Sequence, residues 1–236
     1  MGGQLSASGS FQSLPCTTNA DWMSALCPLL WDVPLHHLSI PGAERHGAAG
    51  HGGAVPGPAD RAHARHAHGD LRVAGEPPPG GRHPGVQELR GHDGGPEVPT
   101  LRQLWARGQQ VIVSYEEASV VSRHAELWPG IPYWWGDQVK AQELIRYLER
   151  MKSCGRPGGL FVAGINLTEN LAYVLGHPCE SLRKMTLPRL PCLRAWVREQ
   201  CPGPGARCTN VIAGDFVGAD SFVGDVVGLN AKLLRR

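Results

Sequence analysis

The sequence predicts an α/β fold built on parallel strands, and three observations support this class. Short strands of apolar residues recur along the chain, amphipathic helices lie between them, and a Gly/Pro/His/Arg-rich segment at 43–96 interrupts the alternation. Alternating strands and helices are typical of parallel sheets. An eight-stranded α/β barrel takes about 250 residues. We therefore expect the two flanks to be the ends of one interrupted barrel domain spanning 21–236.

The N-terminal flank is predicted to contribute one helix and one strand. Residues 1–20 are Ser/Gly-rich and are expected to be mobile. Residues 35–40 are expected to form a strand that ends at Pro41-Gly42. A short helix is predicted at 21–30, with its apolar side formed by Trp22, Leu26, Leu29 and Leu30.

After the interruption, regular structure is expected again. Thr100 can cap a short helix that stops at Gly108. Residues 111–113 are all apolar, as in a strand covered on both faces. Asp137 is a candidate N-cap of a longer helix, whose apolar stripe is Ala141, Leu144, Ile145, Leu148 and Met151.

Two further strand–helix units are predicted to complete the domain. Buried strands are expected at 160–165 and 210–213. A helix at 191–200 would bury Leu193, Trp196 and Val197, and the last helix, from Ser221, would bury Phe222, Val226, Leu229 and Leu233.

Composition narrows the class of protein. A net charge of +2 gives no electrostatic argument for nucleic-acid binding. The seven cysteines are irregularly spaced, which favours free thiols in a reducing compartment. No apolar run is long enough to span a membrane, and no secretory signal pattern opens the chain. We expect a cytoplasmic monomer. Gly2, with Ser6, fits the N-myristoylation pattern, which would give weak, reversible attachment to membranes.

Three interpretations of the 43–96 segment compete. One is a metal site built from its histidines, although Gly and Pro supply little ordered support for ligands. A second is a basic arm for anionic partners, but acidic residues offset its arginines. The third is a frame-shifted stretch of coding sequence, because GC-rich codons read out of frame yield Ala, Gly, Pro, Arg and His. The histidines are His46, His51, His63, His66, His68, His83 and His92.

The frame-shift interpretation can be tested on paper. With suitable synonymous codons, reading Gly69–Glu76 one base later gives Glu-Ile-Ser-Glu-Trp-Leu-Glu, the start of an amphipathic helix. The same shift in Glu76–Leu89 gives Ser-His-Pro-Arg-Glu-Val-Val-Ile-Leu-Ala-Cys-Arg-Asn, a buried strand. Second codon positions are fixed whatever synonyms are chosen, so this interpretation is favoured. As the segment stands, it is predicted to be coil.

Five strings in the flanks resemble the phosphatidylinositol-specific phospholipase C X-domain family. They are long, and together with the residues between them they cover nearly all of the chain outside 43–97. They are DWMSALCPLLWDVPLHHLSIPG (21–42), VPTLRQLWARGQQVIVSYE (98–116), ELWPGIPYWWG (126–136), CGRPGGLFVAGINLTENL (154–171) and WVREQCPGPGARCTNVIAGDFVGAD (196–220).

The resemblance implies a distorted TIM barrel that cleaves phosphodiester bonds with two histidines, one as general base and one as general acid. The implied ligand is a phosphoinositide-type head group at a membrane surface. A metal ion such as calcium serves some members, but nothing here supports one and no cofactor is expected. The positions expected near the barrel mouth are Asp215, as an orienting carboxylate, and Tyr115, Glu116, Trp134, Trp135 and Asn166, as substrate-binding residues.

The chain departs from the family at both histidines. Ala43-Glu44-Arg45 stands where the resemblance implies Ser-His-Asp, and the strand of the second histidine has no counterpart. His46 is a displaced substitute for the first histidine. Two functions are therefore kept open: a phosphoric diester hydrolase that has lost its catalytic histidines and is inactive or severely impaired, or a non-catalytic membrane-associated binding module.

Overall fold

The structure is a computed structural model that describes residues 22–43, 71–72, 98–109, 111–178 and 180–235. Its strands form a four-stranded sheet in the order β1-β7-β6-β5 and a three-stranded sheet in the order β2-β3-β4. The strands are β1 (Ile40–Ala43), β2 (Leu71–Arg72), β3 (Val111–Tyr115), β4 (Leu127–Pro129), β5 (Tyr133–Trp134), β6 (Val162–Gly164) and β7 (Val211–Gly214). The predicted α/β class with parallel strands is confirmed.

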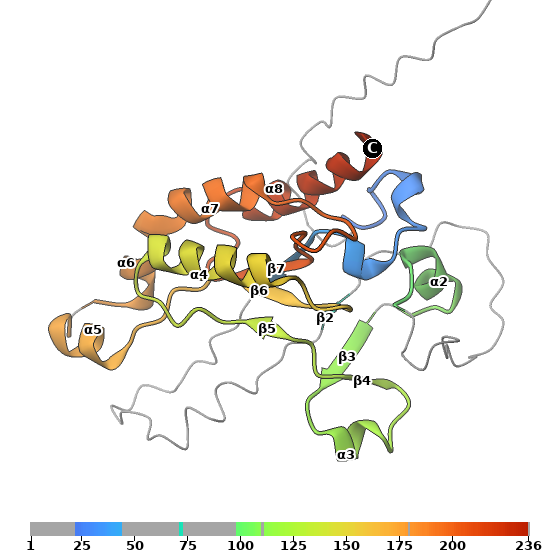
Figure 1. Ribbon diagram of the computed structural model, residues 1–236, viewed down its shortest axis with the longest axis horizontal. Coiled ribbons are helices and arrows are strands. Elements are labelled where there is room, and N and C mark those ends of the chain that lie inside the picture. Colours follow the sequence, from blue (N-terminus) through green and yellow to red (C-terminus); the bar gives the residue numbers. More distant parts are fainter. Residues whose placement is uncertain (1–21, 44–70, 73–97, 110, 179, 236) are drawn as a thin grey trace, which may run out of the picture.

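Helices connect these strands, and α4, α7 and α8 lie together along the four-stranded sheet (Figure 1). The α-helices are α2 (Leu101–Ala106), α3 (Ala118–Val121), α4 (Ala141–Cys154), α5 (Leu171–Gly176), α6 (Leu182–Thr186), α7 (Leu190–Glu199) and α8 (Phe222–Leu229). Short 3₁₀ helices are η2 (Pro28–Leu30), η3 (Leu35–His37), η4 (Leu187–Arg189) and η5 (Asn230–Arg235).

The four-stranded sheet is parallel throughout. Ile40 pairs with Val211, Val162 also pairs with Val211, and Tyr133 pairs with Val162. Ile40 N donates to Asn210 O at 3.1 Å. Because backbone groups alternate along a strand, the nitrogen of Pro41, which carries no hydrogen, faces the edge of β1 away from β7. In the described part of the chain, β1 has no strand on that edge.

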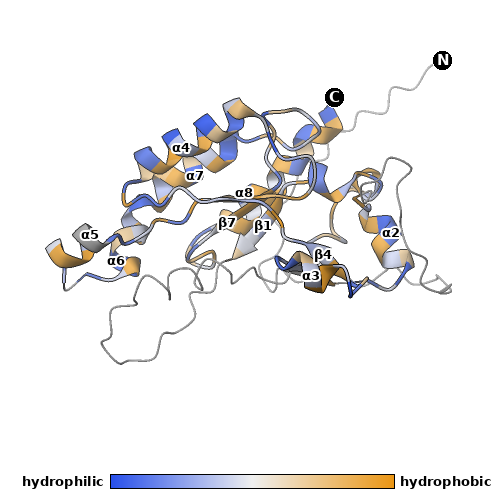
Figure 2. Ribbon diagram, turned by 60° about the horizontal axis from the view of Figure 1, so that its bottom comes forward, coloured by the Kyte–Doolittle hydropathy of each residue, from blue (hydrophilic) through white to orange (hydrophobic). Residues whose placement is uncertain are grey.

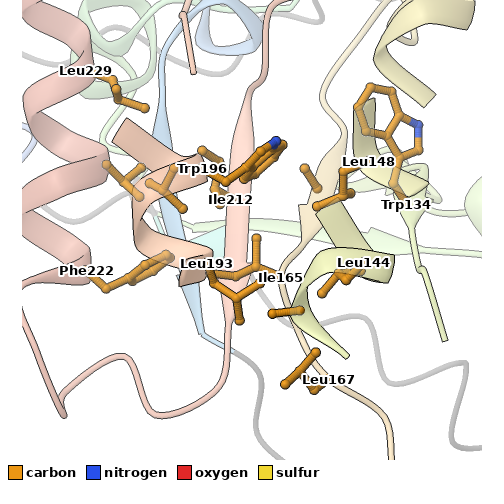
Figure 3. Close-up of a cluster of buried hydrophobic side chains, with 14 of the residues drawn as sticks. Trp134, Leu144, Leu148, Ile165, Leu167, Leu193, Trp196, Ile212, Phe222 and Leu229 are labelled. Carbon is orange, nitrogen blue, oxygen red and sulfur yellow. The ribbon is translucent and has the colours of Figure 1, made fainter. Parts of the chain in front are cut away.

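A hydrophobic core fills the space between this sheet and its helices. Ile212 and Ile165 from the sheet region meet Leu193 and Trp196 of α7, with Leu144 and Leu148 of α4 beside them (Figure 3). The stripe predicted for α4 is confirmed: Ala141, Leu144 and Leu148 are buried, and Ile145 and Met151 pack at the margin of the core. Large buried side chains of this kind each contribute roughly 1.5–3 kcal/mol by leaving water.

The helix predicted at 100–108 is confirmed in detail. Thr100 Oγ1 accepts from Gln103 N, and Gln103 Oε1 accepts from Thr100 N, which completes a capping box. Asp137, by contrast, does not cap α4, because the cap position belongs to Lys140. Asp137 has a φ of 50°, and its neighbour Gln138 accepts a backbone hydrogen bond from Thr168.

The N-terminal flank differs from its prediction. The helix expected at 21–30 is a set of turns followed by η2, since Pro28 cannot donate to a helical hydrogen bond. Leu29, expected to face inward, is 75% exposed. The strand expected at 35–40 is largely η3, and only Ile40 lies in β1. The reason is tertiary: the side-chain amide of Asn210 binds the carbonyls of Leu35 and Leu38, each at 2.8 Å.

The three-stranded sheet also departs from expectation. β3 was predicted to be covered on both faces, yet Val111, Val113 and Tyr115 are exposed and only Ile112 and Ser114 are buried. Strand occurs at two places within the predicted coil at 43–96: Ala43 ends β1, and β2 pairs with β3 in antiparallel fashion. The rest of that prediction, residues 44–70 and 73–96, lies outside the described residues, as does the mobility predicted for 1–20.

Candidate functional site

The parallel strands bring their carboxyl ends to one edge of the four-stranded sheet, which we call the carboxyl edge. Ala43, the last residue of β1, pairs with Gly214, the last of β7. Gly164, the last residue of β6, pairs with Ala213. Ligands of open α/β sheets bind at this kind of edge. The chain continues from β7 directly into Asp215, and Asn166 follows β6 by two residues.

Asn166 is held by its neighbour from β5. It is 5% exposed, and Tyr133 donates a hydrogen bond from its hydroxyl to Asn166 Oδ1 at 3.1 Å. Gly164 makes room for this contact: a Cβ there would lie 2.5 Å from the Tyr133 ring. Asn166 Nδ2 has no hydrogen-bond partner within the part of the chain that the structure describes. The amide thus brings a buried donor to the carboxyl edge.

Asp215 is 5% exposed and opens the loop between β7 and α8. The next residue, Phe216, has a φ of 55°, so the chain turns sharply after the carboxylate. Arg194 of α7 holds the far end of this loop. Its guanidinium lies 3.3 Å from Asp220 and donates to Asp225 Oδ2 at 2.7 and 2.9 Å. The hydrogen bond to Asp225 raises the pKa of Arg194, which keeps this anchor charged.

The two candidate tryptophans separate. Trp134 is buried in the core, with its ring 4.6 Å from that of Phe161 (Figure 3). Trp135 is 42% exposed, and its ring lies 5.9 Å from that of Tyr133. Trp134 is the last residue of β5, and Trp135 lies just beyond the strand, on the side of Tyr133. The structure therefore assigns Trp134 to packing and leaves Trp135 beside the Tyr133–Asn166 pair.

The remaining candidates lie elsewhere. Tyr115 ends β3 of the three-stranded sheet, and Glu116 follows that strand. Both side chains are exposed. His46 and Gly2 fall outside the described residues. Of the candidates, the described structure brings Asn166, Asp215 and Trp135 to the carboxyl edge.

Sequence reasoning missed Tyr133, Gly164 and Arg194. Tyr133 and Gly164 come from separate elements, and only the β5–β6 register places the ring over the glycine. Arg194 appeared in the sequence as a polar residue on an amphipathic helix. No spacing rule connects it with Asp220 and Asp225, which lie in a later element.

A second feature lies near the amino ends of β1 and β7. The rings of His36 and His37 are 3.9 Å apart, and the backbone carbonyl of His36 accepts a hydrogen bond from Arg156. Burial, followed by the charges of His37 and Arg156, lowers the pKa of His36 to about 4. His37 also lines a shallow hollow of about 480 Å³ with Val33, Pro34 and Leu233 among others, remote in the chain from Asp215 and Asn166.

Among residues with described placement, no group of three or more His, Cys, Asp or Glu side chains could hold a metal ion. No helix within the described ranges is long and apolar enough to cross a membrane.

The edge of a parallel α/β sheet, with a buried carboxylate and a buried amide following adjacent strands, fits a ligand-binding α/β protein. The chain belongs to the family of PI-PLC X domain-containing proteins. It is 48% identical over 321 residues to the human PI-PLC X domain-containing protein 1, covering 99% of each. The mouse protein of that name is 41% identical over 312 residues, covering 96% of this chain and 90% of the relative.

More distant relatives match a smaller part. Zebrafish PI-PLC X domain-containing protein 3 is 32% identical over 138 residues, which is 57% of this chain and 42% of that protein. No family model and no solved structure matches the chain. The human alignment is 321 residues long, whereas this chain has 236. Since both sequences are covered almost from end to end, an internal stretch of the relative has no counterpart here.

Proposed function

We propose that this chain binds a phosphoinositol-type head group at the carboxyl edge of a TIM-like barrel and does not hydrolyse it. The activity that the relatives' name implies is phosphoric diester hydrolysis of the phosphatidylinositol-specific phospholipase C type. The parallel order β1-β7-β6-β5 is compatible with one arc of such a barrel. The proposal concerns what remains of the site in this chain.

The observation that carries the proposal is the register of β1 and β7. Ala43 pairs with Gly214, so β1 ends one residue short of the level of Asp215. In the family pattern, a histidine would occupy position 44, the first residue after β1, and a neighbouring carboxylate could fix its tautomer. Here position 44 is Glu44, which cannot act as an imidazole base. Asp215 is thus proposed as the carboxylate that would orient an imidazole at position 44 in the family pattern, and this chain carries no imidazole at that position.

The chain lacks the two histidines of the family pattern but keeps side chains that could bind a ligand. Asn166 Nδ2 is a buried donor suited to a phosphoryl or hydroxyl oxygen of an inositol phosphate. The exposed Trp135 ring offers an apolar face beside it. These groups can orient an inositol phosphate, but neither transfers a proton near neutral pH. A binding module is therefore favoured over a working phosphodiesterase.

The test has a catalytic arm and a binding arm. Release of inositol phosphate from labelled phosphatidylinositol vesicles should stay at background, because each positioned acid or base contributes typically 10²–10⁴-fold. Isothermal titration with inositol 1-phosphate should detect binding. Asn166→Asp should weaken it at least tenfold, since an amide donor becomes a second acceptor with negative charge.

The matched control is Asn170→Asp. Asn170 is exposed and caps α5 through Oδ1, a role that Asp fills equally well. This variant should bind like the parent chain. Robust phospholipid cleavage that disappears in His46→Ala would overturn the proposal and make His46 a working base. Equal binding by both Asn→Asp variants would remove Asn166 from the site.

A further inference from the structure

The helix that follows the candidate site carries exposed apolar side chains. α5 begins seven residues after β6, and Figures 1 and 2 both place it at one end of the molecule. Val174 is 44% exposed and Leu175 is 73% exposed. Figure 2 shows the hydrophobic colouring of α5 at this end. Adjacent exposed apolar side chains at one end of the molecule point to contact with another phase or molecule.

Basic side chains accompany these apolar residues. α6 lies beside α5 in both views, and its Arg183 and Lys184 are exposed. The acidic Glu180 between the two helices accepts a hydrogen bond from the Tyr173 hydroxyl. We call α5 and α6 the tip. Its exposed apolar residues and its cations together suit a lipid bilayer, whose interior is apolar and whose head groups carry negative charge.

The tip is joined to the carboxyl edge. Thr168, which leads into α5, donates its backbone N–H to Gln138 O at 2.9 Å, and Gln138 follows β5. The exposed Trp135 directly follows β5 and precedes Gln138 by three residues. A lipid whose head group binds at the carboxyl edge is itself anchored in a bilayer. The carboxyl edge would then face that bilayer, and Trp135 and the tip would contact it as well.

We propose that the tip docks this chain on anionic lipid bilayers, with Val174 and Leu175 entering the interface and Arg183 and Lys184 contacting acidic head groups. The proposal rests on the proposed function only for the direction in which the carboxyl edge faces. Docking itself depends on exposed apolar area and charge, and it needs no inositol lipid.

The experiment measures sedimentation of the full chain with vesicles that contain no inositol lipid. Chain made without an acylating enzyme is mixed with phosphatidylcholine vesicles, with or without phosphatidylserine. Binding should require phosphatidylserine and should weaken as salt rises. The double variant V174S/L175S should lower the partition coefficient about tenfold or more, because two apolar side chains no longer leave water. The variant R183Q/K184Q should lower binding only to the anionic vesicles.

Leu29→Ser is the matched control. Leu29 is 75% exposed, close to the value for Leu175, but it lies in η2, at the other end of the molecule from α5 in Figure 1. This variant should bind vesicles like the parent chain. Equal loss in Leu29→Ser and V174S/L175S, or no loss in either, would overturn the proposal.

A second outcome would also overturn it. If V174S/L175S changes the mass measured by light scattering in the absence of vesicles, the tip covers another copy of the chain instead of a bilayer. Circular dichroism of each variant shows that it remains folded. Titration with soluble inositol 1-phosphate tests the head-group site separately, so failure of one proposal is distinguishable from failure of the other.

Discussion

Asn230 binds the backbone of Ser39, 191 residues away in the chain, through both the oxygen and the nitrogen of its side-chain amide. Its Oδ1 accepts from Ser39 N at 2.8 Å, and its Nδ2 donates to Ser39 O at 2.9 Å. Both residues are fully buried. The contact closes the segment just before β1 onto the end of α8. It therefore fixes the strand whose carboxyl end borders Asp215.

Asn230→Asp should destabilise the fold by about 3 kcal/mol. The substitution keeps the shape but removes the donor to Ser39 O and buries a charge. Urea unfolding followed by circular dichroism measures the loss. Asn170→Asp, the same change at an exposed helix cap, should leave the unfolding free energy within about 0.5 kcal/mol of the parent value. Equal midpoints for the two variants would contradict the role given to Asn230.

Gly164→Ala should destabilise the chain and release Asn166 from Tyr133. A Cβ at position 164 would approach the Tyr133 ring to 2.5 Å, so the ring or the strand must move. Such overpacking costs roughly 1–3 kcal/mol. Gly158→Ala is the control, because a Cβ there meets nothing within 4 Å. Thermal unfolding of the two variants checks the difference, and a change in Tyr133 fluorescence or NMR shifts in Gly164→Ala alone would locate it.

The stability of the chain should fall between pH 6.5 and about 4 partly because of His36. Its folded-state pKa is lowered to about 4, whereas the unfolded value is near 6.5. In that window the unfolded state binds more protons, so the free energy of unfolding decreases as pH falls. His36→Gln should flatten this part of the pH profile. The backbone carbonyl that binds Arg156 is retained in the variant. A profile of unchanged slope would contradict the assignment.

We predict that the transcript is read out of frame in the segment between β1 and α2. An out-of-frame join before codon 69 and a restored frame near codon 96 would explain the composition of this segment. Sequencing the messenger RNA across codons 42 to 98 is the measurement. An in-frame transcript whose one-base shift contains stop codons across the segment would rule the hypothesis out.

Much of the C-terminal half could be predicted from the sequence because its signals are local. The stripe from Ala141 to Met151 buried the expected face of α4, and earlier in the chain Thr100 capped α2 as predicted. The N-terminal flank could not be predicted equally well. Leu35 and Leu38 have strand-forming neighbours, but Asn210 takes their carbonyl groups and holds them in a turn.

The candidate site likewise has features that the sequence could predict and features that only the structure reveals. Its placement after strand ends follows from sequence, since parallel strands share a carboxyl edge, and Asp215 and Asn166 were found on that basis. The separation of Trp134 from Trp135 required the register of β5 with β6, and the Tyr133–Asn166 bond required Gly164 beneath the ring. Neighbours along the chain determine helices, caps and apolar strands. Contacts such as Asn230 with Ser39 join residues distant in sequence, so only the tertiary structure could decide them.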